Sequence, residues 1–271
     1  MCHSSKTNET YQIITDATAD LTADFMVGLP EVVMIPMPVR VGDRDYTYGP
    51  GGDISAAQFY AYQRSGLFAS TAGVNPYTYA SFFEPILQQG KDVLYLGFSS
   101  GLSGMIQSAI LCADELAEQY PGRRIVCIDT LSASIGEGFL VRETARMQAS
   151  GLSLDELTEW VYANCLRVCH WFTVDSFDHL LHGGRIHAVA AAAGNALQIK
   201  PFLRVDEDGR LKVVSMLRGQ RRARLAMIEK MAMKWQPELG DLVVVGHGGN
   251  LESAERLKQM VQERFPKADI H

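Results

Sequence analysis

The 271-residue sequence has no excess of positive charge and no long apolar run. Its 25 Lys and Arg are outnumbered by 31 Asp and Glu, which gives a formal net charge of −6. Nucleic-acid-binding domains usually carry a basic face, so this composition argues against a nucleic-acid partner. The longest apolar runs, such as residues 188–197, stay well below the roughly 18 to 20 residues that span a bilayer. The sequence therefore predicts a chain with no nucleic-acid partner and no transmembrane segment.

Signals for export, metal binding and nucleotide binding are also missing. The first ten residues, MCHSSKTNET, are polar and lack the apolar stretch of a secretory signal. The five cysteines form no CxxC pair, and Cys165 and Cys169, at helical spacing before His170, are better explained as free thiols than as metal ligands. The sequence has no P-loop lysine, no GxGxxG fingerprint and no metal motif. We therefore expect a cytoplasmic protein without a metal or cofactor.

Short β-branched segments alternate with amphipathic segments over the first 150 residues. The expected strands are residues 11–15, 32–41, 92–98 and 123–129, each bounded by turn residues. Helices are expected at 54–66 and 105–122, where start and stop signals enclose an apolar periodicity. Such alternation is typical of βαβ units, so we expect a parallel sheet covered by helices on both faces.

The pattern changes after about residue 150. A capped helix at 153–168 precedes an expected strand at 169–175 and a hairpin over 197–219, whose turn is the DEDG stretch. A helix, a strand at 241–247 and a last helix complete the chain. The predicted fold class is α/β, with a parallel-sheet domain over residues 10–168 and a smaller mixed α+β domain over residues 169–271.

One hypothesis for the function starts from GFSSG at residues 97–101. This stretch matches G-x-S-x-G and falls between an expected strand and an expected helix, where hydrolases place a nucleophilic serine. Asp175 and His247 would complete the chain order Ser, Asp, His with Ser99. No HGGG-like segment precedes Ser99, and the other two residues fall in the second expected domain. A serine hydrolase is therefore the alternative hypothesis.

The same stretch also suits an anion-binding loop. Gly101 and Gly104 allow a close approach of the backbone, and the loop offers three hydroxyls, on Ser99, Ser100 and Ser103. The helix that begins near Gly104 would direct unpaired N–H groups at the loop. Loops of similar composition are found at residues 15–20, 69–76 and 129–138. Because parallel strands end at one edge, these loops predict a common site for a carboxylate or phosphate.

A basic run lies at residues 217–224 and contains Arg218, Arg221, Arg222 and Arg224. The solvated face of a helix explains such a run without any special function. It would also suit a docking surface for an acidic partner protein, which it would attract electrostatically. A third hypothesis for the function is therefore an interaction module that uses this face.

Six motifs in order resemble the DegV family of fatty-acid-binding proteins over nearly the whole chain. They are DATAD (16–20), STAGVNP (70–76), SSGLSGMIQSA (99–109), HGGRI (182–186), QIKPFLRVDEDG (198–209) and LRGQRRA (217–223). Each of them alone is weak, whereas their shared order is specific. The resemblance implies the two-domain EDD fold of that family.

The resemblance also implies a function without catalysis. Such a protein buries one long-chain fatty acid between its domains and presents the carboxyl group to a fatty-acid kinase, which phosphorylates it for phospholipid synthesis. By resemblance, Thr71 and Ser100 contact the carboxylate, with Ser99, Ser103 and Gly101 beside them. By the same resemblance, Arg218 and Arg221 face the kinase.

The sequence departs from the family pattern at four places. Ala17 and Ala72 stand where the family motifs have serine, and Met105 replaces a threonine at the expected helix start. Family members usually continue through another strand to a histidine before Gly-Pro-Gly, whereas this sequence ends at KADIH. By the resemblance, either this sequence is truncated or the second domain lacks the usual final strand and histidine segment, so that the carboxylate site has lost a partner.

Overall fold

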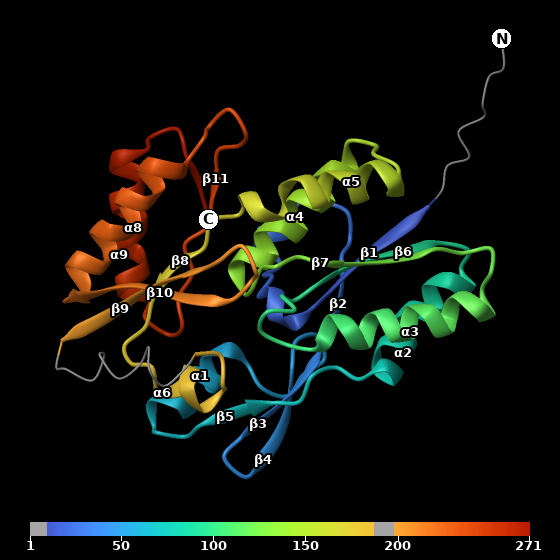
Figure 1. Ribbon diagram of the computed structural model, residues 1–271, viewed down its shortest axis with the longest axis horizontal. Helices are drawn as coiled ribbons and strands as arrows, with labels where there is room; N and C mark the ends of the chain where they lie inside the picture. Colours follow the sequence, from blue (N-terminus) through green and yellow to red (C-terminus); the bar gives the residue numbers. More distant parts are fainter. Residues whose placement is uncertain (1–9, 187–197) are drawn as a thin grey trace.

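A computed structural model of the chain describes residues 10–186 and 198–271. The expected apolar run at 188–197 lies outside these residues. The described residues form a mixed α/β structure, which confirms the predicted fold class. Its main element is a four-stranded parallel sheet, and three smaller sheets accompany it (Figure 1).

The parallel sheet has the strand order β2-β1-β6-β7. Its strands are β1 (Tyr11–Asp16), β2 (Val33–Ile35), β6 (Asp92–Gly97) and β7 (Ile125–Asp129). Every residue of β6 is buried, as expected for an inner strand that is covered on both faces. The strands at 11–15, 92–98 and 123–129 are thus confirmed to within two residues.

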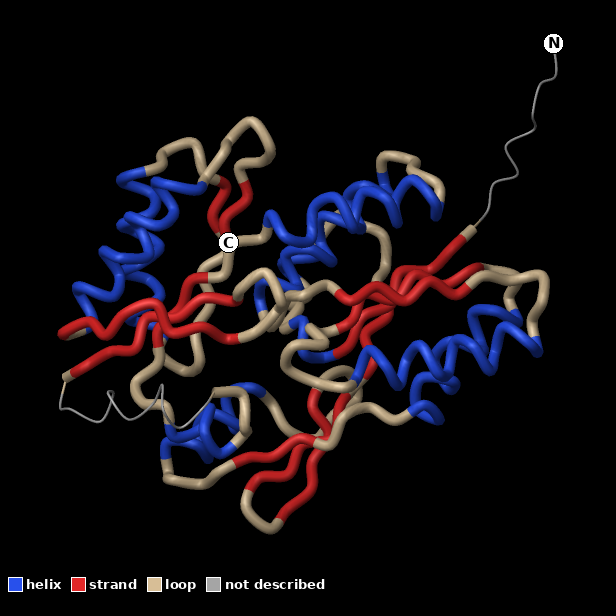
Figure 2. Tube along the Cα trace, in the orientation of Figure 1, coloured by secondary structure: helices blue, strands red, loops and turns tan. Residues whose placement is uncertain are grey.

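Helices cover both faces of this sheet, as Figure 2 shows. One face packs on α2 (Pro76–Gln88) and α3 (Met105–Gln119), and the other on α4 (Ile135–Ala149) and α5 (Leu154–Asn164). The short 3-10 helix η1 (Ala17–Ala19) follows β1 directly, and η2 (Asp24–Met26) precedes β2. The core cluster on the α2 and α3 side also includes Met37, Val39 and Val41, which belong to a separate antiparallel sheet. The parallel sheet and this antiparallel sheet therefore share one apolar interior.

The single strand expected at 32–41 is wrong, because the chain breaks at Pro36. Residues before it form β2, while those after it form β3 (Met37–Val41), the middle strand of an antiparallel sheet with β4 (Arg44–Tyr48) and β5 (Ala69–Thr71). A proline has no N–H for a sheet ladder, so it is a natural point for a change of sheet. Helix α1 (Ala56–Arg64) lies within the helix expected at 54–66 and starts after Ser55, whose side chain caps it.

The C-terminal part is built on an antiparallel sheet, here called the C-terminal sheet, with the order β10-β9-β8. Its strands are β8 (Trp171–Thr173), β9 (Ile199–Val205) and β10 (Leu211–Arg218), so the hairpin expected at the DEDG turn is present. Helices α8 (Gln220–Lys234) and α9 (Leu251–Arg264) lie together at this end of the molecule (Figure 1). The domain division at residues 168 and 169 stays a prediction.

Short elements complete the described chain. They are η3 (Cys165–Arg167), α6 (Asp178–His182), β11 (Leu242–Val243) and β12 (Asp269–Ile270). The strand expected at 241–247 is thus reduced to two residues, which pair in parallel with β12. None of the helices in residues 10–186 and 198–271 has both the length and the apolar character needed to cross a membrane.

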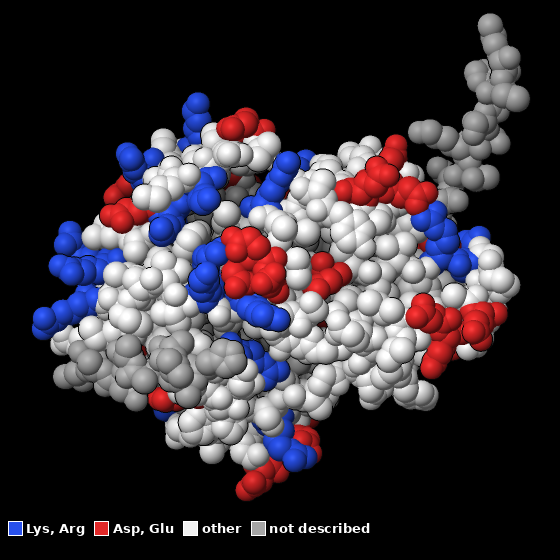
Figure 3. Space-filling view, viewed as in Figure 1, with Lys and Arg blue, Asp and Glu red and all other residues white. Residues whose placement is uncertain are grey.

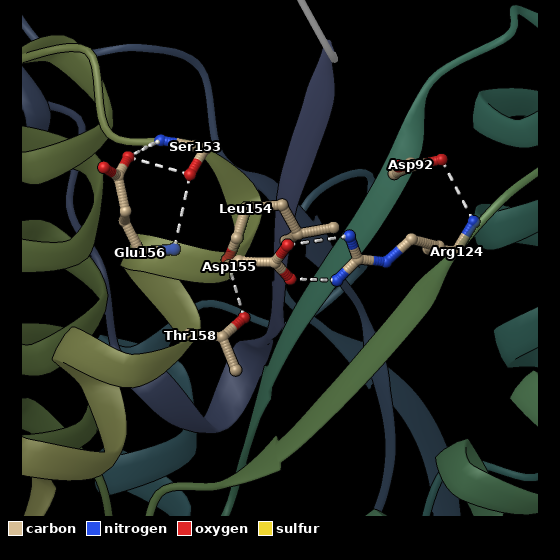
Figure 4. A network of polar contacts seen from close by, with 7 residues as sticks. All are labelled: Asp92, Arg124, Ser153, Leu154, Asp155, Glu156 and Thr158. Atoms are coloured by element: carbon tan, nitrogen blue, oxygen red, sulfur yellow. Dashed lines mark hydrogen bonds and ion pairs between the residues drawn. The ribbon is translucent and has the colours of Figure 1, made fainter. Parts of the chain in front are cut away.

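Polar contacts tie α5 to the edge of the parallel sheet (Figure 4). Ser153 caps α5 in a capping box, in which its own N–H donates to Glu156 Oε2 at 2.8 Å. The guanidinium of Arg124 binds the exposed carboxylate of Asp155 through both of its terminal nitrogens. On the other side, the buried carboxylate of Asp92 accepts the backbone N–H of Arg124 at 3.0 Å.

These two aspartates lead to a matched prediction of stability. The side chain of Asp92 is 5% exposed and that of Asp155 is 67% exposed. Asp92→Ala leaves a half-buried backbone donor without its acceptor, so we expect a loss of about 2 kcal/mol in the free energy of unfolding. Asp155→Ala removes a solvated ion pair and should cost less than about 1 kcal/mol. Urea denaturation of both variants checks this order, and equal losses would contradict it.

Candidate functional site

The expected binding loops gather at the carboxyl edge of the parallel sheet. Strands β1, β6 and β7 run in parallel and end at Asp16, Gly97 and Asp129. The segments that follow these strands therefore start at one edge of the sheet. They are residues 17–20, 98–104 and 130–134. Open α/β sheets bind their ligands at this edge, so the geometry agrees with the location of the expected site.

The segment 98–104, here called the serine loop, holds four of the expected ligand-binding residues. Its Ser99 is fully buried, and its Oγ donates to the carbonyl oxygen of Gly209 at 2.8 Å. Ser100 is exposed, and its N–H donates to Asp129 Oδ1 at 3.1 Å. Gly101 and Ser103 are half-buried. The serine loop thus presents Ser100 to solvent, while Ser99 faces the β9–β10 turn.

Thr71 reaches the same region from the antiparallel sheet. It is the last residue of β5, pairs with Val39 and has an exposed side chain. The segment that follows runs past the start of α3, since a Cβ at Gly73 would lie 3.2 Å from Met105 Cγ. Met105 is the first residue of α3, as expected. The structure therefore brings the Thr71 segment beside the helix that follows the serine loop.

Helix α3 begins without a capping side chain. Its N-cap residue is Gly104, which has no side chain to accept a hydrogen bond from the first turn. The first N–H groups of a helix have no partner within the helix and carry partial positive charge. An anionic group at the serine loop would satisfy them.

A buried acidic cluster lies beneath the carboxyl edge, and sequence reasoning did not identify it. Asp16, at the end of β1, is fully buried, as is Glu137 in the first turn of α4. The hydroxyl of Thr18 contacts both carboxyls, reaching Glu137 Oε2 at 3.1 Å and Asp16 Oδ1 at a shorter distance. A hydroxyl has a single proton, so Thr18 can donate fully to only one of the two carboxyls, and a proton kept on the other carboxyl would satisfy both contacts.

The pKa shifts in this cluster agree with a retained proton. Burial raises the pKa of Glu137 well above its usual range, and the neighbouring Asp16 raises it further. Burial also raises the pKa of Asp16, against the hydrogen bonds from Thr18, Tyr95 and the Phe98 backbone, which lower it. The pKa of Asp20 is raised for the same reason, namely burial. The carboxyl edge of the sheet thus carries less negative charge than it would if all of these carboxyl groups were ionised.

Two tyrosines extend the acidic cluster towards the first core. Tyr95 on β6 donates to Asp16 Oδ2 at 2.6 Å, and its oxygen lies 2.9 Å from that of Tyr79 on α2. Burial raises the pKa of both phenols, so both stay protonated and able to donate. The sequence contained one signal for the cluster, because Glu137 is an acidic residue between two glycines at the start of a helix. Its fully buried location could be seen only in the fold.

The Ser-Asp-His triad of the hydrolase hypothesis is not assembled. The hydroxyl of Ser99 donates a hydrogen bond to the carbonyl oxygen of Gly209, and Asp175 forms an ion pair with Lys200 at 2.5 Å. The Nδ1 of the exposed His247 accepts a hydrogen bond from the N–H of Gly249. Among the described residues, these three side chains do not hydrogen-bond one another. Chain order alone makes Asp175 and His247 candidates for the triad, and chain order does not determine positions in space.

Basic residues of two family motifs, HGGRI and LRGQRRA, lie on the C-terminal part. Arg185 reaches back to the serine loop, where its Nε donates to the carbonyl of Leu102 at 3.3 Å. Arg218 and Arg221 are exposed, at the end of β10 and the start of α8. Figure 3 shows basic side chains gathered at the edge of the molecule where these elements meet. Within the described ranges, no group of His, Cys, Asp and Glu is arranged to hold a metal ion.

Comparison with known proteins assigns the chain to a family. Residues 10–271 match the sequence model of the family described as "Uncharacterised protein, DegV family". The DegV domain-containing protein CPE0026 of Clostridium perfringens is 34% identical over 260 residues, which cover 96% of this chain and 89% of that protein. The chain therefore belongs to the DegV family.

Solved structures share the fold. A fatty-acid (stearic acid)-binding protein from Eubacterium ventriosum is 26% identical, with a TM-score of 0.85 over 96% of this chain and 90% of its own. A fatty-acid-binding DegV family protein from Thermus thermophilus is also 26% identical, with a TM-score of 0.81 over the same shares. The Fatty Acid Kinase (Fak) B3 protein of Streptococcus pneumoniae, loaded with linoleic acid, matches with a TM-score of 0.84 over 96% and 91% at 24% identity.

The acidic cluster gives a prediction of pH dependence. A carboxyl whose pKa is raised on folding stabilises the fold below its unfolded pKa, and this contribution is lost as the pH rises through the folded value. For Glu137 the loss starts near its ordinary pKa of 4.5 and continues upwards, because its folded pKa is raised. Glu137→Gln cannot ionise, so its melting temperature relative to the parent protein should rise between pH 5 and pH 8.

The control for this prediction is Glu118→Gln, at an exposed position of α3. Its melting temperature relative to the parent protein should be the same at both pH values. Differential scanning fluorimetry measures all three proteins. A Glu137→Gln difference that is equal at pH 5 and pH 8 would show that Glu137 ionises normally in the folded chain.

Proposed function

We propose that this protein binds a long-chain fatty acid whose carboxyl group lies near Thr71 and Ser100. The observation that carries the proposal is that the segment following Thr71, the last residue of β5, meets the N-terminal end of α3, which follows the serine loop. Two solved proteins of the same fold at 26% identity are described as fatty-acid-binding. The proposed ligand therefore fits both the site and the relatives.

The energetics of such a ligand suit this site. At about 0.8 kcal/mol per buried methylene, a chain of about 16 carbons has a gross transfer free energy on the order of 12 kcal/mol, before the costs of association. The tail therefore drives binding, and the head group needs only orientation and replacement of its lost water. Exposed hydroxyls and the uncapped N-terminus of α3 supply both.

The acidic cluster supports the proposal indirectly. Two ionised carboxylates beneath the serine loop would repel an anionic head group. Their raised pKa values mean that they tend to keep a proton, which lessens this repulsion. No catalytic residue is needed for this function, in agreement with the separate positions of Ser99, Asp175 and His247.

We further propose that the bound fatty acid is presented to a fatty-acid kinase through the basic surface formed by Arg218 and Arg221. The support is the resemblance of LRGQRRA to the family motif and the exposure of both guanidinium groups. Basic groups at the rim of a contact speed encounter with an acidic partner, and salt weakens their effect. The ligand would lie between the parallel-sheet part and the C-terminal part of the chain.

Fatty-acid binding is tested first by extraction. Purified protein should release a long-chain fatty acid into organic solvent, identified by mass spectrometry. Each loss of one hydroxyl contact, in Ser100→Ala and in Thr71→Val, should weaken binding of a fluorescent fatty acid about 5- to 10-fold, as expected for one hydrogen bond. Ser150→Ala, at the C-cap of α4, and Thr158→Val, on α5, lie away from the serine loop and serve as controls. A protein that is repeatedly empty and takes up no added fatty acid would refute the proposal.

The docking proposal is tested with charge reversal. The double variant Arg218→Glu, Arg221→Glu should bind fatty acid as the parent protein does, but should lower acyl-phosphate formation by a fatty-acid kinase at least about tenfold at low salt. Lys258→Glu, at an exposed position of α9, changes charge on another surface and should have little effect. If all three proteins support the kinase equally, Arg218 and Arg221 do not form the docking surface.

A further inference from the structure

The buried hydroxyl of Ser99 joins the serine loop to the C-terminal sheet. Its Oγ donates to the carbonyl oxygen of Gly209 at 2.8 Å and accepts the N–H of Gly101 at 3.1 Å. Ser99 has no exposed surface. Because a hydroxyl has only one proton, Ser99 cannot donate to a ligand while this contact is made. The resemblance places Ser99 beside a carboxylate, whereas its hydrogen bonds connect the serine loop to Gly209.

Two glycines make this contact possible. Gly209 has a φ of +71°, and a Cβ there would lie 2.0 Å from Ser99 Oγ and 3.1 Å from Leu131 Cα. From the other side, a Cβ at Gly101 would lie 2.5 Å from the carbonyl oxygen of Asp208. The serine loop and the β9–β10 turn thus meet backbone to backbone. Any side chain at either glycine would push the two segments apart.

The β9–β10 turn is itself held in one conformation. Asp206 Oδ1 accepts the N–H groups of Asp208 at 3.1 Å and Arg210 at 2.9 Å, and the Asp206 carbonyl accepts the N–H of Gly209 at 3.0 Å. Figure 1 shows this end of the orange hairpin directed towards the parallel-sheet part. The turn therefore offers the carbonyl of Gly209 at a fixed position.

The serine loop is fixed from its other side by β7. Asp129 Oδ1 accepts the N–H of Ser100 at 3.1 Å and that of Leu131 at 3.0 Å. The N–H of Ser99 donates to the carbonyl of Ser132 at 3.0 Å. The exposed hydroxyl of Ser100 is thus carried by a segment held on one side by β7 and on the other by the C-terminal sheet.

We propose that Ser99 is a positioning residue, which fastens the serine loop to the β9–β10 turn and so holds the Ser100 hydroxyl in its binding orientation. Release of the ligand is then coupled to opening of the Ser99–Gly209 contact. The inference rests on the proposed function for the identity of the ligand, but the contact itself does not depend on it. Loss of the contact leaves Ser100 on a looser loop, which lowers affinity mainly through faster dissociation.

A double-mutant cycle separates positioning from direct contact. Ser99→Ala should weaken binding of a fluorescent fatty acid about 5- to 10-fold, mostly through a higher dissociation rate, whereas Ser108→Ala on α3 should leave it unchanged. In a Ser100→Ala background, Ser99→Ala should change affinity less than about twofold, because the group that it positions is gone. The same loss in both backgrounds would make Ser99 a direct ligand contact and overturn the proposal.

A second measurement needs no ligand. In the ligand-free protein, Ser99→Ala should speed hydrogen exchange of the Gly101 amide at least about tenfold, since that amide loses its acceptor. Gly101→Ala keeps the Ser99 hydroxyl but forces the turn away, and should raise fatty-acid dissociation in the same direction. Unchanged exchange of the Gly101 amide in Ser99→Ala would show that Ser99 Oγ does not lie where its bonds to Gly101 and Gly209 require, and would overturn the proposal even if the protein binds no fatty acid. Accelerated exchange in a protein that binds no fatty acid would instead refute the proposed function alone.

Discussion

The parallel pairing of β1, β6 and β7 is the constraint on which the rest of the structure depends. It brings Asp16, the serine loop and Asp129 to one edge of the sheet, although they are spread over residues 16 to 129 of the chain. Helices on both faces bury the strands, so that polar groups can gather only where the strands end. The candidate site follows from this arrangement, because the N-terminal end of α3 meets the segment after β5 beside the serine loop.

The site combines buried carboxyls with an exposed hydroxyl surface. Thr18 contacts both Asp16 and Glu137, and Tyr95 donates to Asp16. The raised pKa values of the two carboxyls limit the charge beneath the serine loop. The loop above is neutral, with Ser100 exposed and the first turn of α3 uncapped. An anionic group on an apolar tail would therefore find donors without meeting a strong repulsion. Because Ser100 and the N-terminus of α3 supply the donors for the ligand, the hydroxyl of Ser99 is left to bond the carbonyl of Gly209.

Sequence reasoning predicted the parts of the structure that depend on local pattern. The fold class, the DEDG hairpin and the start of α3 at Met105 are confirmed, because apolar periodicity and turn residues determine them. The continuous strand at 32–41 was wrong, since the pattern does not show that the residues after Pro36 pair with β4 and β5 instead of β1. The acidic cluster and the role of Ser99 depend on contacts over about 110 residues, which no local pattern reveals.

The most direct test of the account is a crystal structure of the protein purified with a long-chain fatty acid. The account predicts a tail between the parallel-sheet part and the C-terminal part, and a carboxyl group within hydrogen-bond distance of the Thr71 and Ser100 hydroxyls, with Ser99 still bonded to Gly209. A carboxyl group bound elsewhere, or contacted by Ser99 instead of Ser100, would contradict it.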